Sequence, residues 1–325
     1  MRTRTKYITT GRMTGHMTGH MTGRFAPSPT GRMHLGNIYS ALLSWLSARK
    51  QGGRFVLRIE DIDRQRSREE YALQIEDDLR WLGLDWDERY VQSTRGDIYE
   101  RYLERLAALH LTYPCYCTRA DIMATQAPHE SDGRVVYKGT CRPGNISADR
   151  IPARPGATRI IVPDEDITFS DIHYGRQTVN LSRHCGDFIL RRADGAWAYQ
   201  LAVVVDDALM GITEVVRGRD LLLSVPQQLY LFRLLGLTPP SYAHIPLLCN
   251  EAGQRLSKRD RSLDMGALRQ RFSPEEIVGF LAYHAGLLPR PEPVAPRDIV
   301  SLFSWDSLPT ADITVPSDIA GLLKG

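Results

Sequence analysis

Residues 23–37 read GRFAPSPTGRMHLGN, in which two prolines and three glycines surround a single histidine. Each proline pushes the residue before it out of the helical region, so the chain from Phe25 to Pro29 is expected to be extended. Asn37 is expected to cap a helix, because apolar residues follow it at helical spacing until Gly52. This order predicts an extended segment that leads directly into a helix N-terminus.

Such a helix entrance is suited to binding a nucleotide. Backbone amides and the helix dipole attract phosphate there, and in a parallel sheet this place lies at the ligand-binding edge. Gly31 and Gly36 leave room for a bulky ligand near the backbone, and His34 supplies a donor for phosphate oxygens. Because a histidine at a turn is usually an ordinary polar surface residue, the stretch alone is a weak indication.

A basic loop far along the chain strengthens this prediction. It reads GQRLSKRD and covers residues 253–260. Its cations Arg255, Lys258 and Arg259 are suited to stabilising a departing pyrophosphate. By itself such a run is usually a solvated turn. The two segments together predict a nucleotide site that is closed from two sides.

The remaining patterns predict a parallel α/β fold. The segment RFVLRIED at 54–61 is a predicted strand, and SREE at 67–70 is a predicted capping box with Ser67 as the cap. Strands alternate with helices here, which is the order of a parallel sheet. Further predicted elements are a helix at 98–109, strands with a short helix at 187–218, a helix from Pro226 to Gly236 and a helix at 273–288.

Composition divides the chain into five parts. Residues 12–24 repeat a four-residue unit without apolar periodicity, so a disordered tail is predicted up to residue 22. The middle is rich in Cys, Pro and Gly and is predicted to be an insertion. The predicted parts are the tail (1–22), the first half of a nucleotide-binding catalytic domain (23–112), the insertion (113–180), the second half of the catalytic domain (181–245) and the basic loop with a short helical C-terminal part (246–325).

Bulk properties exclude several classes of protein. No apolar run approaches the ~20 residues of a membrane span, and the N-terminus lacks the apolar middle of a secretory signal, so we expect a cytoplasmic protein with no membrane partner. The net charge is +3, but residues 1–24 contribute five basic groups and no acid, which leaves 36 basic and 38 acidic groups elsewhere. Nucleic-acid binding must therefore rest on local patches.

Four separate motifs resemble those of the class I aminoacyl-tRNA synthetases and follow one another along the chain in the same order as in that family. PSPTGRMHLGN is similar to their HIGH signature, and RLSKR at 255–259 is similar to their KMSKS loop. RFAPSPTG, which overlaps the first of these motifs, and the further motifs LRIEDID and VVRGRDLL resemble marks of the glutamyl branch. The chain departs from the pattern at Asn37, where the family has His, and at Arg255, where it has Lys. Asn can still donate to phosphate or ribose, and Arg keeps the charge.

The resemblance implies an ATP-dependent ligase with a Rossmann-like catalytic domain and Mg²⁺ on the phosphates. It implies catalytic roles for His34 and Lys258. The residues implied to contact ATP are His34, Gly36, Asn37 and Lys258.

The same resemblance implies a pocket for L-glutamate. Free glutamate needs a cation for its side-chain carboxylate and an anion or acceptors for its ammonium. In the family pattern Glu60 faces the ammonium, and the other residues around the amino acid are Arg24, Ala26, Ser28, Tyr199 and Arg217. Without the family pattern, the better interpretation is an ion pair of Arg217 with Asp220 or a neighbouring acid, and a core aromatic at Tyr199.

The stretch after the basic loop separates two branches of the family. Ordinary glutamyl-tRNA(Glu) synthetases carry a large anticodon-binding region there, whereas 65 residues follow Asp260 here. The chain is therefore expected to lack an anticodon-binding domain. It resembles the short paralogues, which transfer glutamate to the queuosine base in the anticodon loop of tRNA(Asp). Val203, where the ordinary enzyme usually has Asn, agrees with this resemblance, and we expect a monomer.

Three cysteines, Cys115, Cys117 and Cys141, gather in the predicted insertion. Three thiolates in a cytoplasmic chain suggest structural zinc, which takes four tetrahedral ligands. Zinc chemistry favours His129 as the fourth ligand, whereas the family resemblance favours Tyr137. The resemblance places this module where it helps to dock the anticodon arm.

Three other functions stay open at this point. The chain could be an ordinary glutamyl-tRNA(Glu) synthetase, or a non-catalytic tRNA-binding paralogue. It could also be a nucleotidylyltransferase with a small-molecule acceptor, which shares the His-x-Gly piece but has no need of a glutamate pocket.

Overall fold

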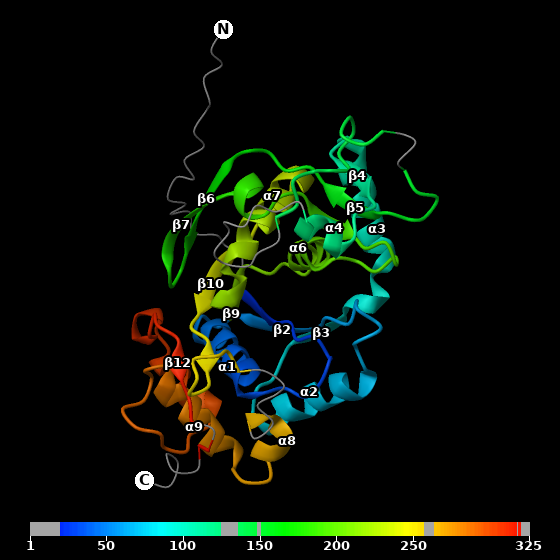
Figure 1. Ribbon diagram of the computed structural model, residues 1–325. Coiled ribbons are helices and arrows are strands. Elements are labelled where there is room, and N and C mark those ends of the chain that lie inside the picture. Colours follow the sequence, from blue (N-terminus) through cyan, green and yellow to red (C-terminus); the bar gives the residue numbers. More distant parts are fainter. Residues whose placement is uncertain (1–19, 125–135, 148–150, 257–262, 317, 320–325) are drawn as a thin grey trace.

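Parallel strands from both halves of the chain build the centre of the molecule in the computed structural model (Figure 1), which describes residues 20–124, 136–147, 151–256, 263–316 and 318–319. One sheet has the order β1-β2-β3 and is parallel throughout. A second has the order β7-β6-β10-β9, in which only the β6–β7 pair is antiparallel. The strands are β1 (Thr22–Phe25), β2 (Arg54–Ile59), β3 (Glu88–Val91), β6 (Asp166–Asp171), β7 (Gly175–Asn180), β9 (Glu214–Gly218) and β10 (Ser241–Ile245).

β1 and β9 join the two sheets side by side. The Thr213 N–H donates to the Thr22 carbonyl at 2.9 Å, and Arg24 Nη1 donates to the Val216 carbonyl at 3.3 Å. These contacts advance in the same direction along both strands, so the carboxyl ends of β1, β2, β9 and β10 meet at one edge. The predicted parallel α/β fold is confirmed.

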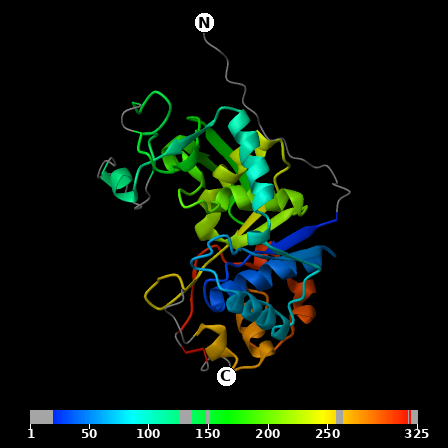
Figure 2. The ribbon, with the colours of Figure 1, turned by 90° about the vertical axis from the view of Figure 1, so that its right-hand side faces the viewer.

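Helices cover both faces of this assembly (Figures 1 and 2). On one side, Leu42 and Leu79 share a core with Leu57 of β2. On the other, Leu106, Val204 and Leu231 share a second core. The helices are α1 (Leu35–Lys50), α2 (Glu69–Trp81), α3 (Gly96–Ala108), α6 (Tyr199–Leu209) and α7 (Val225–Leu235), with 3-10 turns at Gln92–Thr94 and Arg219–Ser224.

The folded chain starts before the boundary predicted at residue 23. Thr22 is the first residue of β1 and is 4% exposed, and Met21 packs against the core. Its position follows from the parallel register, which sets Thr22 opposite Arg54. The last unit of the repeat therefore forms part of the sheet. This depends on pairing with β2, which is distant in the chain, so the repeat itself gives no sign of it.

Two predicted helix caps are wrong by a few residues. His34, not Asn37, caps α1, and Asn37 sits at the third helical position, where its side chain accepts from the His34 N–H. Arg68, not Ser67, precedes α2, and no side chain caps that helix. At α1 the cap is still local, because the His34 ring accepts from the Gly36 N–H, but histidine is not among the usual capping residues.

The region predicted as an insertion contains more regular structure than its composition indicates. β4 (Thr112–Cys115), β5 (Ala157–Ile160) and β8 (Phe188–Arg191) form an antiparallel sheet in that order. β8 lies beyond the predicted boundary at 180, and β6, which lies before it, pairs with β10 of the central assembly. Short helices α4 (Arg119–Ala124) and α5 (Leu181–His184) complete this part.

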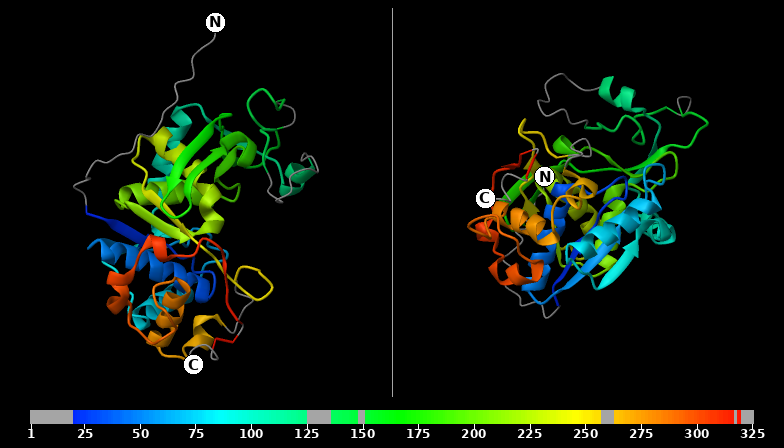
Figure 3. Two further views of the ribbon diagram at one scale, coloured as in Figure 1. Left: turned by 90° about the vertical axis from the view of Figure 1, so that its left-hand side faces the viewer. Right: turned by 90° about the horizontal axis from the view of Figure 1, so that it is seen from below.

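The C-terminal part packs beside α1 (Figure 3). Lys50 donates to the carbonyl of Ser301 at 3.3 Å. Its elements are β11 (Leu248–Cys249), paired in parallel with β12 (Ile313–Thr314), α8 (Met265–Leu268), α9 (Pro274–His284) and 3-10 turns at Pro296–Leu302 and Trp305–Ser307. Ser273 caps α9 as predicted. Within the described residues, no helix has both the length and the apolar character of a membrane span.

Gly279 of α9 offers a test of this packing. A Cβ built at Gly279 would lie 1.9 Å from the Glu292 carbonyl oxygen, and backbone cannot move away cheaply. We expect Gly279→Ala to lower the free energy of unfolding by ~1–3 kcal/mol, the usual cost of overpacking. The matched change Gly96→Ala meets only Trp197 at 3.6 Å and should be nearly neutral. Equal denaturant midpoints for the two variants would contradict this packing.

Candidate active site

A cavity of about 430 Å³ opens at the carboxyl ends of β1, β2 and β9. It brings together every described residue that the sequence predicts for amino-acid or ATP binding. These are Arg24, Ala26, Ser28, His34, Gly36, Asn37, Glu60, Tyr199 and Arg217. They come from segments far apart in the chain, so the fold itself assembles the site.

A buried arginine that the sequence analysis did not single out supports one wall of this cavity. Arg58 of β2 is fully buried, and its Nη1 donates to the Asp207 carboxylate at 2.6 Å. Its Nη2 donates to Glu60 at 3.0 Å. Burial raises the pKa of Glu60 above its ordinary value, although Arg58 and Arg24 oppose that shift. Glu60 therefore reaches the cavity as a carboxyl group held by a fixed cation.

Arg24 stands next to this pair at the end of β1. Its Nε lies 3.7 Å from Asp207 and donates no hydrogen bond in the described part of the chain. Burial lowers the pKa of Arg24, while Asp207 acts in the opposite direction. A guanidinium so deeply buried is stabilised by any further anion placed in the cavity.

Arg217 enters the cavity from β9, and two neighbouring strands hold its guanidinium. Its Nε donates to His244 Nε2 at 3.0 Å, so that nitrogen carries no proton. His244 carries its proton on Nδ1 instead, which lies 2.6 Å from the Asp171 carboxylate. Burial lowers the pKa of His244, and the nearby Arg217 acts in the same direction, so the ring stays neutral.

Within the described part of the chain, Arg217 donates only to neutral acceptors and forms no ion pair. Besides His244, these are the Tyr199 hydroxyl and the Leu221 carbonyl, each at 3.3 Å. Asp220, the carboxylate expected from the residues alone, pairs with Arg255 instead. A buried guanidinium without a carboxylate partner makes the cavity a site for an anionic ligand.

His34 has one defined proton position. Its Nδ1 accepts from the Gly36 N–H at 3.1 Å, so the neutral ring carries its proton on Nε2. A Cβ built at Gly36 would lie 3.1 Å from the His34 ring. Glycine at this position therefore leaves the histidine room to adopt its capping position.

The described residues on either side of 257–262 are held by backbone hydrogen bonds. Arg255 and Leu256 line the same cavity, and Leu256 donates to the Leu248 carbonyl at 2.9 Å. On the other side, Met265 donates to the Met33 carbonyl at 2.9 Å. Lys258 lies outside the described residues.

Comparison with known proteins agrees with this geometry. Residues 20–283 match the family model of the catalytic domain of class I tRNA synthetases (E and Q). This chain belongs to that class I family.

Similar curated proteins indicate which branch of the synthetase family this chain resembles. A Glutamyl-Q tRNA(Asp) synthetase of Nitratidesulfovibrio vulgaris is 49% identical, over 93% of this chain and 97% of its own. A Glutamyl-Q tRNA(Asp) synthetase of Symbiobacterium thermophilum is 47% identical, over 93% of this chain and 98% of its own. Among solved structures, a glutamate tRNA ligase from Elizabethkingia meningosepticum, in complex with its amino acid, has a TM-score of 0.77 at 28% identity, over 91% of this chain and 67% of its own.

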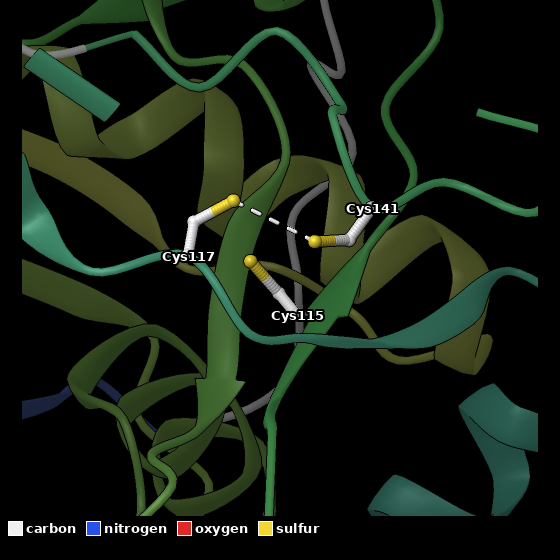
Figure 4. A group of neighbouring side chains, drawn as sticks. All are labelled: Cys115, Cys117 and Cys141. Atoms are coloured by element: carbon white, nitrogen blue, oxygen red, sulfur yellow. Dashed lines mark hydrogen bonds between the residues drawn. The ribbon is translucent and has the colours of Figure 1, made fainter. Parts of the chain in front are cut away.

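The synthetase also brings its three clustered cysteines together (Figure 4). The sulfur atoms of Cys115, Cys117 and Cys141 lie within 4.8 Å of one another. The Tyr137 hydroxyl lies 3.8 Å from the Cys117 sulfur and accepts from the Cys141 N–H at 2.7 Å. His129, the other predicted fourth ligand, lies outside the described residues.

This donor set suits a thiophilic cation such as Zn²⁺. Burial raises the pKa of Cys117 to about 11, with a further contribution from its contact to Cys141. Burial also raises the pKa of the Tyr137 phenol, reinforced by its hydrogen bonds to Cys115 and Cys141. Zinc would therefore have to displace protons from this cluster, which makes its binding weaker at low pH.

Several supporting residues of the synthetase site escaped the sequence analysis. Arg58 and Asp207 are charged residues inside otherwise apolar segments, and that contrast is a usable signal of a buried ion pair. Asp171 and His244 give no such signal, because their contact depends on which strands become neighbours in the sheet.

The cysteine cluster yields a direct prediction. We expect Cys141→Ser to weaken zinc binding by at least ~100-fold, because even the loss of an outer-shell partner can cost that much. Zinc in the purified protein is measured by atomic emission. Cys185→Ser, outside the cluster, is the control and should keep the wild-type content. Unchanged zinc in Cys141→Ser would contradict a metal site at this cluster.

Proposed function

We propose that this synthetase activates L-glutamate with ATP and transfers it to the queuosine base in the anticodon loop of tRNA(Asp). The observation that carries the proposal is Arg217, a buried arginine with no carboxylate partner among the described residues, which lines the same cavity as Glu60 and His34. The names of the similar curated proteins support the choice of acceptor.

The charges of the cavity match those of glutamate. Arg217 and Tyr199 provide donors for the side-chain carboxylate, and Glu60 provides the anion for the ammonium. Charge-assisted hydrogen bonds of this kind are worth ~1.5–3 kcal/mol each. Arg24 provides a cation for the remaining carboxylate, while Ala26 and Ser28 line the amino acid.

Activation is an in-line displacement. An oxygen of the glutamate α-carboxylate attacks the α-phosphorus of ATP, and pyrophosphate leaves. The His34 Nε2–H and Lys258 stabilise the charge that develops on the phosphates, which is the main contribution a synthetase site makes besides positioning. Magnesium bound to the phosphates would neutralise further charge.

Transfer and docking complete the proposal. A hydroxyl of queuosine attacks the mixed anhydride, and AMP leaves. The module of Cys115, Cys117, Tyr137 and Cys141 holds zinc and stiffens the surface that docks the anticodon arm. The enzyme acts in the cytoplasm, where its tRNA substrate is found.

Glutamate-dependent ATP–pyrophosphate exchange in the absence of tRNA tests the activation step. Exchange is expected, and transfer of labelled glutamate is expected only to tRNA(Asp) that carries queuosine. The control substrates are unmodified tRNA(Asp) and tRNA(Glu). Absence of exchange would overturn the proposed activity, and charging of tRNA(Glu) would indicate the ordinary synthetase instead.

The contact between His244 and Arg217 predicts a selective effect on glutamate binding. We expect His244→Leu to raise the KM for glutamate ~5-fold with little change in kcat, because loss of one hydrogen bond costs about 1 kcal/mol and frees the guanidinium to rotate. His244→Gln keeps an acceptor for Arg217 Nε and should recover most of the loss. Equal KM values for both variants would show that His244 acts only through packing.

A further inference from the structure

Residues 309–315, here called the C-terminal strap, lie against segments that belong to the catalytic part of the chain. Near the start of the strap, the Tyr174 hydroxyl donates to the Thr310 carbonyl at 2.9 Å. At its end the strap forms β12, which pairs in parallel with β11 (Figure 1), and the Val315 N–H donates to the Cys249 carbonyl at 2.8 Å. The strap is therefore held at two places, on the turn between β6 and β7 and on β11.

Asp312, in the middle of the strap, contacts two separate segments with one carboxylate. Its Oδ1 accepts from the Leu247 N–H at 2.9 Å, and both of its oxygens accept from the Arg219 guanidinium. The Leu247 carbonyl in turn accepts from the Ile313 N–H at 2.9 Å. The hydrogen bond from Arg219 lowers the pKa of the Asp312 carboxyl, so the group is ionised at neutral pH. The strap thus holds both backbone groups of Leu247.

Both segments that Asp312 contacts belong to the wall of the first cavity. Leu247 lines the cavity directly, and Arg219 stands between the lining residues Gly218 and Asp220. Asp312 does not line the cavity itself. Any effect of this carboxylate on a substrate therefore acts through the position of the two segments.

The segment that Asp312 holds at Leu247 leads into the basic loop. β11 starts at the next residue, Leu248, whose carbonyl accepts from the Leu256 N–H at 2.9 Å. Leu256 and Arg255 belong to the basic loop and line the first cavity. A shift at the start of β11 is therefore passed to the loop whose cations are proposed to meet the phosphates of ATP.

The glutamate side of the cavity depends less on the strap. Arg217 donates to His244 of β10 and to the Tyr199 hydroxyl of α6, which the strap does not hold. Only its third acceptor, the Leu221 carbonyl at 3.3 Å, belongs to the 3-10 turn that begins at Arg219. Loss of the strap contact is thus expected to disturb the two halves of the cavity unequally.

We propose that Asp312 is a positioning residue for the ATP side of the synthetase site. Its carboxylate fixes the Leu247 backbone and thereby the strand that carries the basic loop. This inference rests on the proposed function, because it assigns the basic loop to ATP.

An Asp312→Ala variant tests the inference. We expect kcat/KM for ATP in glutamate-dependent ATP–pyrophosphate exchange to fall ~10-fold, as loss of one charge-assisted hydrogen bond would cause. The Kd for L-glutamate, measured by calorimetry without ATP, should stay within about twofold of wild type. Asp312→Asn keeps an oxygen that accepts from the Leu247 N–H and should recover exchange to within about threefold.

Two further variants serve as controls. Arg219→Ala removes the ion pair but leaves the carboxylate on Leu247, and a partly exposed pair contributes little. Its kcat/KM for ATP should stay within about threefold of wild type. Asp298→Ala removes an exposed carboxylate elsewhere in the C-terminal part and should change neither measurement.

Three outcomes would overturn the inference. One is pyrophosphate exchange at the wild-type level in Asp312→Ala, and another is an equal loss in Asp312→Asn. The third is a parallel loss of glutamate affinity and exchange in Asp312→Ala, which would show a general structural role. Absence of exchange in the wild type is a failure of the proposed function instead, and it is recognised without any variant.

Amide hydrogen exchange of the wild-type protein provides a test that needs no variant. Because coupling between two sites is reciprocal, a strap that supports the ATP side is itself stabilised when ATP binds. Addition of ATP with magnesium should therefore slow hydrogen exchange at the Leu247, Ile313 and Val315 amides. Unchanged hydrogen exchange at these amides with ATP bound would contradict the inference.

Discussion

Arg58 lies fully buried among three carboxylates, and the geometry of the substrate cavity depends on this contact. It binds Asp207 at 2.6 Å and Glu60 at 3.0 Å, and lies 3.9 Å from Asp206. Arg24 and Arg95 supply two further cations, so three guanidinium groups face three carboxylates. Removing one partner from such a buried cluster commonly costs ~3–5 kcal/mol. The cluster ties β2 to α6 and thereby fixes Glu60 at the cavity.

Beside this neutralised cluster, Arg217 carries a positive charge for which the described residues supply no carboxylate partner. His244 and Asp171 orient it through hydrogen bonds but do not cancel it, because the neutral imidazole separates the two charges. A ligand that brings a carboxylate completes the balance.

The sequence alone predicts the parts of this molecule whose chemistry is local. The segment from Arg24 to Asn37, the basic loop and the Cys115–Cys117 pair are recognisable because their residues lie close together in the chain, and the described ones do meet in the structure. The entry of β6 into the central assembly and the contact of His244 with Asp171 were not predictable, because each depends on tertiary packing. The cap at His34 is local, but histidine is not among the usual capping residues. Arg58 is intermediate, since a charged residue in an apolar strand signals a buried partner without identifying it.

Calorimetric titration of the ligand-free protein tests the central claim most directly. The account predicts that L-glutamate binds without ATP or tRNA, and that L-glutamine, which has the same shape but no side-chain charge, binds at least ~10-fold more weakly, since a charge-assisted hydrogen bond is replaced by a neutral one. Equal affinities for the two amino acids, or no binding of glutamate, would contradict it.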